Sequence, residues 1–587
     1  MEAWEYLTLS SAHVLERRRR GDAGQRVGRH VPVLAGTTAG SATDKYEERE
    51  CVMADIADGN GKHIPADQQH IPADMDPRDA QVILDALAED VKPGGVDDYD
   101  EALAAVLNSS LIVGPDPSII DDIKTAPDPT QQLADDTALE SQVDEIYQAV
   151  MSRAPEHRVQ PSLERVRYAL NLMGDPQTAY RSIHITGTNG KTSTARMIEA
   201  VLREQGLRTG RFTSPHLNTV RERISIDGRA ISRADFVQTW EEVAPFIELT
   251  DRWSGEHGGP AMSFFEVFTV MAYSAFAMAP IDVAIVEVGM GGQWDATNVI
   301  DADVAVLMPV DLDHQKWLGN TVEEIASEKL GILKPGKVLV SARQRPSVKE
   351  LIDARVKEQN AQLFYYGDDF ELTSREVAVG GQLVSVRTPN AFYEDVPLAM
   401  LGAYQGLNAA AALMAVEAFF YGHSLSADVV EHALMSTRSP GRLEVVKGSP
   451  VVIIDAAHNP HGAAATVEAL QEAFPGPRVA VYSAFADKDI EGVLGVMEPA
   501  FAALVLTQMP GERAADIDAI GDIARSVFGE DRVHSEPDLA NAIATAADIA
   551  ETLDPDSLAP ASVTVMGSIM LAAEARELLG AHKVDES

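Results

Sequence analysis

Short runs of apolar and β-branched residues alternate with longer segments of helical periodicity through the middle of the chain. The runs with the character of strands are 182–186, 283–288, 304–308 and 337–341. Strands separated by segments of helix length are typical of parallel βαβ units. The pattern therefore predicts an α/β domain built on a parallel sheet.

A second series of the same kind follows towards the end of the chain. Its strand-like runs are 451–455, 479–483, 503–507 and 562–566, again with helical stretches between them. A Ser-Pro-Gly sequence at 439–441 separates the two series, and Pro and Gly interrupt regular elements. We therefore expect two α/β domains, over 139–438 and 439–587. We find no internal repeat or heptad array in the sequence.

The chain before residue 139 has a different character. Residues 1–138 mix Asp, Pro and Gly with short helical pieces at 80–88 and 99–106. We expect an acidic, largely disordered extension there. The alternatives are an acidic arm that binds a partner, or an overextended start whose true position is Met53 or Met75. Beyond it, helical periodicity begins, with apolar positions at Val143, Ile146, Tyr147, Val150, Leu163, Val166, Leu170 and Leu172.

The charge of the chain is strongly negative and unevenly distributed. The 587 residues include 48 Lys and Arg against 90 Asp and Glu, a net charge of −42. The segment 41–140 alone holds six basic and twenty-four acidic side chains. Such a balance excludes attraction to phosphate backbones as the main mode of binding nucleic acid, and an anionic membrane would repel it. Most of the chain carries a much lower density of negative charge.

The remaining composition favours a cytoplasmic enzyme. The one cysteine, Cys51, excludes an intramolecular disulfide and any multi-cysteine metal site. The longest apolar stretch, 264–280, is interrupted by Glu266, Thr269 and Ser274, so we expect no membrane span.

The strongest local motif lies between a strand and a helix. It reads Thr186-Gly-Thr-Asn-Gly-Lys191-Thr-Ser, after the apolar run that ends at Ile185 and before a helical run over 194–204. Glycines let backbone amides converge on phosphate oxygens, and a lysine neutralises the terminal phosphates. The loop is shorter than the usual eight-residue pattern, because that spacing needs Gly where Ile185 stands. A glycine-rich turn without a ligand is the alternative.

Further polar groups follow in a fixed order along the chain. They are Ser214-Pro-His-Leu, Glu287-Val-Gly-Met-Gly-Gly-Gln-Trp-Asp-Ala-Thr-Asn298, Asp311-Leu-Asp-His314 and Glu328-Lys329. Glu287 ends an apolar strand, where a carboxylate can reach a metal held beside bound phosphates. Taken singly, Glu287 can be a surface carboxylate, and His314 and Ser214 can be turn residues. Their order after the phosphate loop favours a site.

Together with QGLNAAAA, PGRLE and DAAHNPHG further on, these motifs resemble the folylpolyglutamate synthase and dihydrofolate synthase family, within the Mur ligase type of ATP-dependent amide ligases. The resemblance covers roughly 139–579. It implies an α/β fold with a larger N-terminal P-loop domain that binds ATP and a smaller C-terminal Rossmann-like domain. It also implies ligation of L-glutamate to dihydropteroate or a reduced folate through an acyl phosphate, by a monomer. The stretch 160–166 resembles the pteroate-binding segment of bifunctional members.

The resemblance also implies roles for individual residues. The ATP contacts would be Thr188, Asn189, Gly190, Lys191, Asn408, Arg442 and Asp455, and the catalytic groups Lys191, Lys329 and His458. The magnesium ligands would be Ser214, Glu287, His314 and Lys329, with Lys329 carboxylated on its amine; a plain salt-bridging lysine is the alternative there. A monovalent cation such as K⁺ would be a further cofactor. The substrates would contact Gln160, Pro161, Ser162, Leu163, Ser263, Phe264, Phe265, Glu266, Trp294, Asp295, Ala296 and Ser568.

Two other functions remain open from the sequence. A cell-wall Mur ligase uses the same ATP machinery, but the Ser214-Pro-His-Leu loop followed by Arg221-Glu-Arg-Ile argues against it. A nucleotide-dependent binding module without ligase turnover is the other. The intact set of loop, glutamate, histidine and lysine argues against that function.

Overall fold

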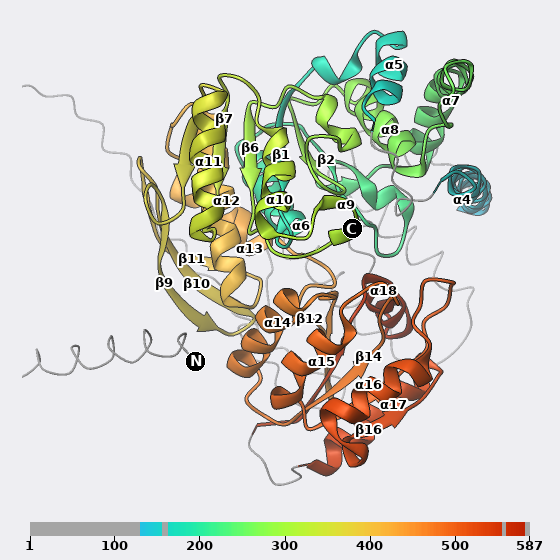
Figure 1. Cartoon of the computed structure of the whole chain (residues 1–587), viewed down its shortest axis with the longest axis vertical. Helices are drawn as coiled ribbons and strands as arrows, with labels where there is room; N and C mark the ends of the chain where they lie inside the picture. Colours follow the sequence, from blue (N-terminus) through green and yellow to red (C-terminus); the bar gives the residue numbers. More distant parts are fainter. Residues whose placement is uncertain (1–128, 155–161, 554–558, 582–587) are drawn as a thin grey trace, which may run out of the picture. The chain divides into compact units, whose positions relative to one another are not determined.

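The computed structural model describes residues 129–154, 162–553 and 559–581. The expected extension lies outside these residues up to position 128, and its last ten residues belong to helix α4 (Pro129–Met151). We call the described residues up to 438 the larger lobe and those from 439 onwards the smaller lobe. Figure 1 colours the larger lobe from blue to light orange and the smaller lobe from orange to red.

An eight-stranded sheet forms the centre of the larger lobe, in the order β4-β3-β2-β5-β1-β6-β7-β8. The strands β5, β1, β6, β7 and β8 run parallel, and β2 is parallel to β5, whereas β2–β3 and β3–β4 pair antiparallel. The sheet is therefore mixed at one edge, which the strand pattern had not indicated. The bounds are β1 Arg181–Thr186, β2 Thr209–Phe212, β3 Ile224–Ile226, β4 Arg229–Ala230, β5 Val283–Glu287, β6 Val304–Leu307, β7 Val338–Ser341 and β8 Gln362–Tyr365.

Helices cover both faces of this sheet. Ile183, Ile285 and Val306 belong to a core with the helices of one face, α6 (Lys191–Glu204), α12 (Ala403–Phe419) and α13 (Ala427–Ser436). The strand residues that alternate with these, such as Val286 and Leu307, point to the opposite face of the sheet. The helices on that face are α5 (Glu164–Leu172), α7 (Arg233–Glu256), α8 (Phe264–Met278), α10 (Val322–Lys329) and α11 (Pro346–Glu358). Burial on both faces explains why the predicted central strands are continuous apolar runs.

A three-stranded antiparallel sheet was not predicted from the sequence. It consists of β9 (Glu371–Ala378), β10 (Gly381–Arg387) and β11 (Phe392–Leu398), with β10 in the middle. Val384, Val386 and Val396 pack in the same core as α12, so one face of the small sheet is buried. Its other face carries polar positions, which hides it from a search for apolar runs.

The smaller lobe contains a six-stranded sheet in the order β12-β13-β17-β14-β15-β16, parallel except for the β12–β13 pair. The four strands predicted here are found as β13, β14, β15 and β17. The bounds are β12 Glu444–Gly448, β13 Val451–Asp455, β14 Arg478–Tyr482, β15 Ala503–Leu506, β16 Val533–Ser535 and β17 Ser562–Met566. Helices α14 (Pro460–Ala473), α15 (Ile490–Met497) and α16 (Ile517–Phe528) cover one face, and α17 (Leu539–Leu553) and α18 (Ile569–Leu578) the other.

These arrangements confirm the predicted α/β class. They also place the ends of β1, β5 and β6 at one edge of the larger sheet, where the motif residues follow each strand. Within the described ranges, no helix combines the length and the apolar character needed to cross a membrane.

Candidate functional site between the two lobes

One large cavity, of about 1470 Å³, is lined by residues of both lobes. Leu163 does not line it, and Gln160 and Pro161 lie outside the described residues. All other predicted site residues do, namely Ser162, Thr188, Asn189, Gly190, Lys191, Ser214, Ser263, Phe264, Phe265, Glu266, Glu287, Trp294, Asp295, Ala296, His314, Lys329, Asn408, Arg442, Asp455, His458 and Ser568. Residues up to 406 positions apart in the sequence thus meet in one space.

The phosphate-type loop joins β1 to α6 with its backbone exposed to the cavity. Gly190 caps α6 with a φ of 88°, and a Cβ there would lie 2.8 Å from Oδ1 of Asn408. Only glycine allows that close approach. Lys191 Nζ donates to the carbonyl oxygens of Gly187 and Thr188 at 3.1 and 3.2 Å, so the ammonium lies within the loop. Burial lowers the pKa of Lys191, although Glu287 and Asp313 oppose that shift.

Glu287 is buried at the end of β5, next to the loop. Thr192 Oγ1 donates to its two carboxylate oxygens at 2.9 and 3.0 Å, and the backbone N–H of Ser214 also donates to this carboxylate. Burial raises the pKa of Glu287, with Lys191 and Thr192 opposing. The predicted metal residues Ser214 and Glu287 are therefore neighbours. Thr192 follows the loop lysine within the motif, but the sequence indicated no role for it.

Lys329 ends α10 and is 4% exposed. The loop after β5 docks onto this end of the helix, because Gln293 N donates to the carbonyl oxygen of Glu328 at 3.0 Å. A Cβ on Gly292 would lie 2.6 Å from the Lys329 carbonyl oxygen, so the two segments touch. Burial and the charge of Lys191 lower the pKa of Lys329 to about 7.

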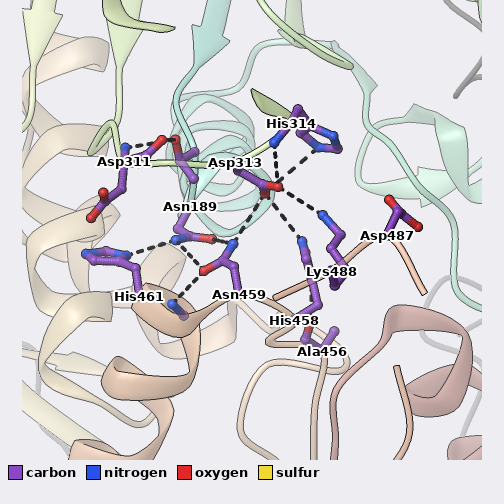
Figure 2. A network of polar contacts seen from close by, with 12 residues as sticks. Asn189, Asp311, Asp313, His314, Ala456, His458, Asn459, His461, Asp487 and Lys488 are labelled. Carbon is purple, nitrogen blue, oxygen red and sulfur yellow. Dashed lines mark hydrogen bonds and ion pairs between the residues drawn. The ribbon is translucent and has the colours of Figure 1, made fainter. Parts of the chain in front are cut away.

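A polar network around Asp313 connects the lobes (Figure 2). Asp313 follows β6, and its side chain is 12% exposed. Lys488 Nζ, from the loop between β14 and α15, donates to Asp313 Oδ1 at 2.9 Å. Nε2 of His458 and Nε2 of His314 lie 3.7 and 3.9 Å from Asp313 Oδ2. Burial by itself raises the pKa of Asp313, but His458, His314 and Lys488 outweigh it and hold that pKa well below its usual range.

Two amide side chains extend the network to the phosphate-type loop. Asn459 Nδ2 donates to Asp313 Oδ2 at 3.3 Å and to Asn189 Oδ1 at 3.4 Å. Nδ2 of Asn189 lies 2.9 Å from Nδ1 of His461, as Figure 2 shows. The start of α14 therefore contacts the loop that carries Lys191. Neither Asp313 nor Asn459 was predicted, although both lie inside quoted motifs.

Arg442 and Asp455 approach the cavity from the smaller lobe. Arg442 lines the same cavity as Lys191 and Glu287, and its charge lowers the pKa of both groups. Asp455 Oδ2 accepts from Leu443 N at 2.8 Å, and its Oδ1 accepts from Ala457 N at 2.8 Å. Asp455 is thus engaged with its own lobe and holds the backbone next to Arg442.

Aromatic side chains form a further part of the cavity lining, which we call the aromatic end and which includes Phe264, Phe265 and Trp294. Phe264 and Phe265 are the first two residues of α8. Both pack against the hydrophobic core of the larger lobe, and both also line the cavity. Ser263 and Glu266 form the capping box of this helix, and Arg165 Nε donates to Glu266 Oε1 at 2.9 Å. These two polar residues therefore hold α8 in place. Ser568 has a similar local task, since its side chain caps α18 by accepting from Met570 N.

Three aromatic-end residues were not predicted. Tyr147 of α4 lies edge-on to His216 at 5.8 Å between ring centres, and both line the cavity. Arg223 Nε donates to His216 Nδ1 at 2.9 Å, and its guanidinium carbon lies 4.9 Å from the ring centre of Phe264. His216 belongs to the SPHL motif and Arg223 to the RERI motif that follows it. Their positions in the sequence shortly after Ser214 could have indicated that they belong to the site.

The donor set suits Mg²⁺ shared with phosphates better than a metal held by protein alone. In the described part of the chain, no three His, Cys, Asp or Glu side chains converge as a metal site. Mg²⁺ commonly uses one or two carboxylates together with phosphate oxygens and water. The buried carboxylate of Glu287, paired with a hydroxyl beside the phosphate-type loop, fits that requirement.

Comparison with known proteins agrees with this geometry. Residues 260–416 match the Mur ligase middle domain, and residues 441–568 match the Mur ligase glutamate ligase domain. The dihydrofolate synthase/folylpolyglutamate synthase of Mycobacterium tuberculosis is 44% identical over 447 residues, which cover 73% of this chain and 92% of that protein.

Solved structures give the same result. A Mycobacterium tuberculosis folylpolyglutamate synthase complexed with ADP and AMPPCP is 42% identical and superposes with a TM-score of 0.72, covering 76% of this chain and 99% of that one. An FPGS–AMPPCP–folate complex is 30% identical with a TM-score of 0.64, covering 74% of this chain and 99% of that one. The chain belongs to the dihydrofolate synthase/folylpolyglutamate synthase family of the Mur ligases.

Proposed function

We propose that this protein ligates L-glutamate to dihydropteroate and to the γ-carboxyl of reduced folates, with ATP as the energy source. The observation that carries the proposal is one cavity that is lined both by the charged residues Lys191, Glu287 and Arg442 and by aromatic side chains. Relatives with the same fold bind AMPPCP and folate. We also propose that the domains divide at 439, as the sequence indicates.

The polar end of the cavity is suited to ATP. The backbone of Thr188, Asn189 and Gly190 would hold the phosphates, and Lys191 would offset the charge on the γ-phosphate during its transfer. Asn408 lies against Gly190 and would contact the base. Arg442 would reach the phosphates from the smaller lobe, and Asp455 would fix the backbone beside it.

The reaction needs an activated carboxylate. An oxygen of the pterin substrate's carboxylate attacks the γ-phosphorus of ATP, which forms an acyl phosphate and releases ADP. The amine of L-glutamate then attacks the acyl carbon, the amide bond forms, phosphate leaves, and the amine loses a proton. Most of the rate would come from positioning and electrostatics rather than from a covalent protein nucleophile. Asn459 and Lys488 contact the larger lobe, and with substrates bound this contact would help to keep water from the acyl phosphate.

The metal would be held by Glu287, Ser214, His314 and a carboxylated Lys329, with a monovalent cation as a further cofactor. Mg²⁺ would supply charge neutralisation at the phosphates. Thr192 holds Glu287 in place, and Asp313 lies beside His314. A carbamate on Lys329 is proposed from the resemblance, since an ammonium would repel the metal whereas a carbamate offers anionic oxygens.

The aromatic end would take the pterin substrate. Trp294, Phe264 and Phe265 present ring surface to the cavity, with Asp295 and Ala296 beside them. Ser263 and Glu266 shape this end by capping α8. His458 and Ser568 line the cavity from the smaller lobe, where the incoming glutamate would lie.

Phosphate release tests this function directly. Purified protein with ATP, Mg²⁺ and L-glutamate should release phosphate with dihydropteroate and, separately, with a reduced folate, and mass spectrometry should detect each glutamylated product. Omission of Mg²⁺ or glutamate should abolish release. Phosphate release with the folate but not with dihydropteroate would refute the proposed ligation of glutamate to dihydropteroate. Nucleotide binding without any glutamate-dependent release would favour the binding module.

The lobe contact at Asp313 should also matter for turnover. Asp313→Ala leaves Lys488 without its carboxylate and removes a group beside His314, so kcat/KM should fall by about 10- to 100-fold. Asp303→Ala is the matched control, because Asp303 pairs with Arg181 and Lys337 at the opposite end of β6. Thermal melting of both variants separates lost stability from lost activity. Equal kcat/KM in the two folded variants would contradict the prediction.

A further inference from the structure

Arg576 is a buried cation that neither the motifs nor the resemblance indicated. It lies near the end of α18, and its side chain is 1% exposed. A guanidinium is costly to bury unless its donors are hydrogen-bonded. Its contacts explain the burial and reach into both lobes.

Within the smaller lobe, Arg576 pairs with Glu444 of β12. Its Nε donates to Glu444 Oε2 at 2.8 Å and its Nη2 donates to Oε1 at 3.1 Å, which makes a two-pronged ion pair. Glu444 Oε2 also accepts from Gly441 N at 2.8 Å. Gly441 directly precedes Arg442 and has a φ of 65°. Arg576 therefore orients the carboxylate that fixes the backbone before Arg442.

Across the lobes, Arg576 reaches the loop that carries Ser214. Its Nη1 donates to Asn218 Oδ1 at 2.6 Å. Glu222 holds the same loop from its other side, since its carboxylate accepts from the backbone N–H groups of Leu217, Asn218 and Thr219 at 2.9 to 3.0 Å. The loop is thus held by Glu222 of its own lobe and by Arg576 of the other.

The two segments that Arg576 contacts, the Ser214 loop and the segment before Arg442, also touch each other. The Leu217 side chain would lie 3.4 Å from a Cβ on Gly441, so the Ser214 loop packs directly on the segment before Arg442. We infer that Arg576 is a positioning residue that sets Arg442 and the Ser214 loop relative to each other. This inference rests on the proposed function. A purely structural role, in which Arg576 only attaches α18 to β12, is the alternative.

Steady-state kinetics and thermal melting of four variants test the inference. Arg576→Met should lower kcat/KM for ATP about 10- to 100-fold, in the range of a charge-assisted hydrogen bond to a buried group. Asn218→Ala removes the contact between lobes together with a side chain that lines the cavity, and it should lower kcat/KM about 3- to 10-fold with little change in Tm. The double variant should match Arg576→Met, because the effect of Asn218 depends on its contact with Arg576, which Arg576→Met already removes. Arg576→Lys keeps the charge but not the fork and should lie between Arg576→Met and the wild type.

Arg532→Met is the matched control. Arg532 also forms an ion pair in the smaller lobe, with Nη1 2.8 Å from Glu498 Oε1, and it does not line the cavity. It should lower Tm while leaving the kcat/KM of the folded protein unchanged. If Arg576→Met does not fold, Asn218→Ala and Arg576→Lys decide. Values of kcat/KM for these variants within about twofold of Arg532→Met would overturn the inference.

Calorimetric binding of ADP separates this inference from the proposed function. If the wild type releases no phosphate in the presence of glutamate, the proposed function is refuted. The positioning role of Arg576 is then tested by the ADP-binding data alone. Arg576→Met and Asn218→Ala should then bind ADP about 3- to 10-fold more weakly than Arg532→Met, because Arg442 is displaced. Equal ADP affinities would overturn the positioning role.

Discussion

Lys191→Met is expected to lower kcat/KM by about 10³-fold or more, the cost of losing a buried cation that stabilises charge in the transition state. Lys191 is the cation of the phosphate-type loop, and its ammonium is already held beside the backbone that would bind the phosphates. The charge of Lys191 also lowers the pKa of the buried Glu287, so the substitution removes a positive charge that stabilises this carboxylate. Phosphate release measures the effect.

A second lysine of the larger lobe provides the control. Lys337 lies before β7 and pairs with Asp303 at 3.0 Å, away from the cavity. Lys337→Met should lose stability but keep its turnover per folded molecule. A loss below about tenfold in folded Lys191→Met would show that the loop lysine does not carry the phosphoryl transfer.

The central strands were predictable because burial on two faces makes them continuous apolar runs. The run 451–455 coincides with β13, and 283–288 overshoots β5 by one residue. β2 was missed for a physical reason: its Arg211 is fully buried and pairs with Glu199 of α6, so a charged letter occupies a core position. Sequence patterns treat such a residue as exposed, and only the fold supplies its partner.

The site residues likewise include some that the sequence could predict and some that it could not. The loop of Lys191 could be found because its residues are adjacent in the sequence and each has a local function. The contact of Asp313 with Lys488 spans 175 positions, and that of Arg576 with Asn218 spans 358. No local pattern encodes such pairs, since they form only when the two lobes meet. Ser263 and Glu266 show the opposite case, in which motif residues that line the cavity also serve as a helix cap.

Lys329→Met should likewise abolish turnover, with a loss of about 10³-fold or more if the side chain carries a metal-facing anion. Burial and Lys191 lower the pKa of Lys329 to about 7, so near neutral pH a large share of the amine is uncharged. An uncharged amine can attack the carbon of CO₂ and lose a proton, which leaves a carbamate. The wild type should therefore lose activity when CO₂ is removed and regain it with bicarbonate, as followed by phosphate release.

Lys334→Met is the matched control for Lys329. Burial lowers the pKa of Lys334 as well, but its Nζ donates to the carbonyl oxygen of Asn298 at 3.0 Å and it does not line the cavity. That variant should keep both its turnover and its response to bicarbonate, whereas Lys329→Met should show neither. A crystal structure would show directly whether the amine of Lys329 is carboxylated. Full activity without CO₂, together with an unmodified Lys329 in that crystal, would leave the lysine as a plain cation and remove the carbamate from the metal site.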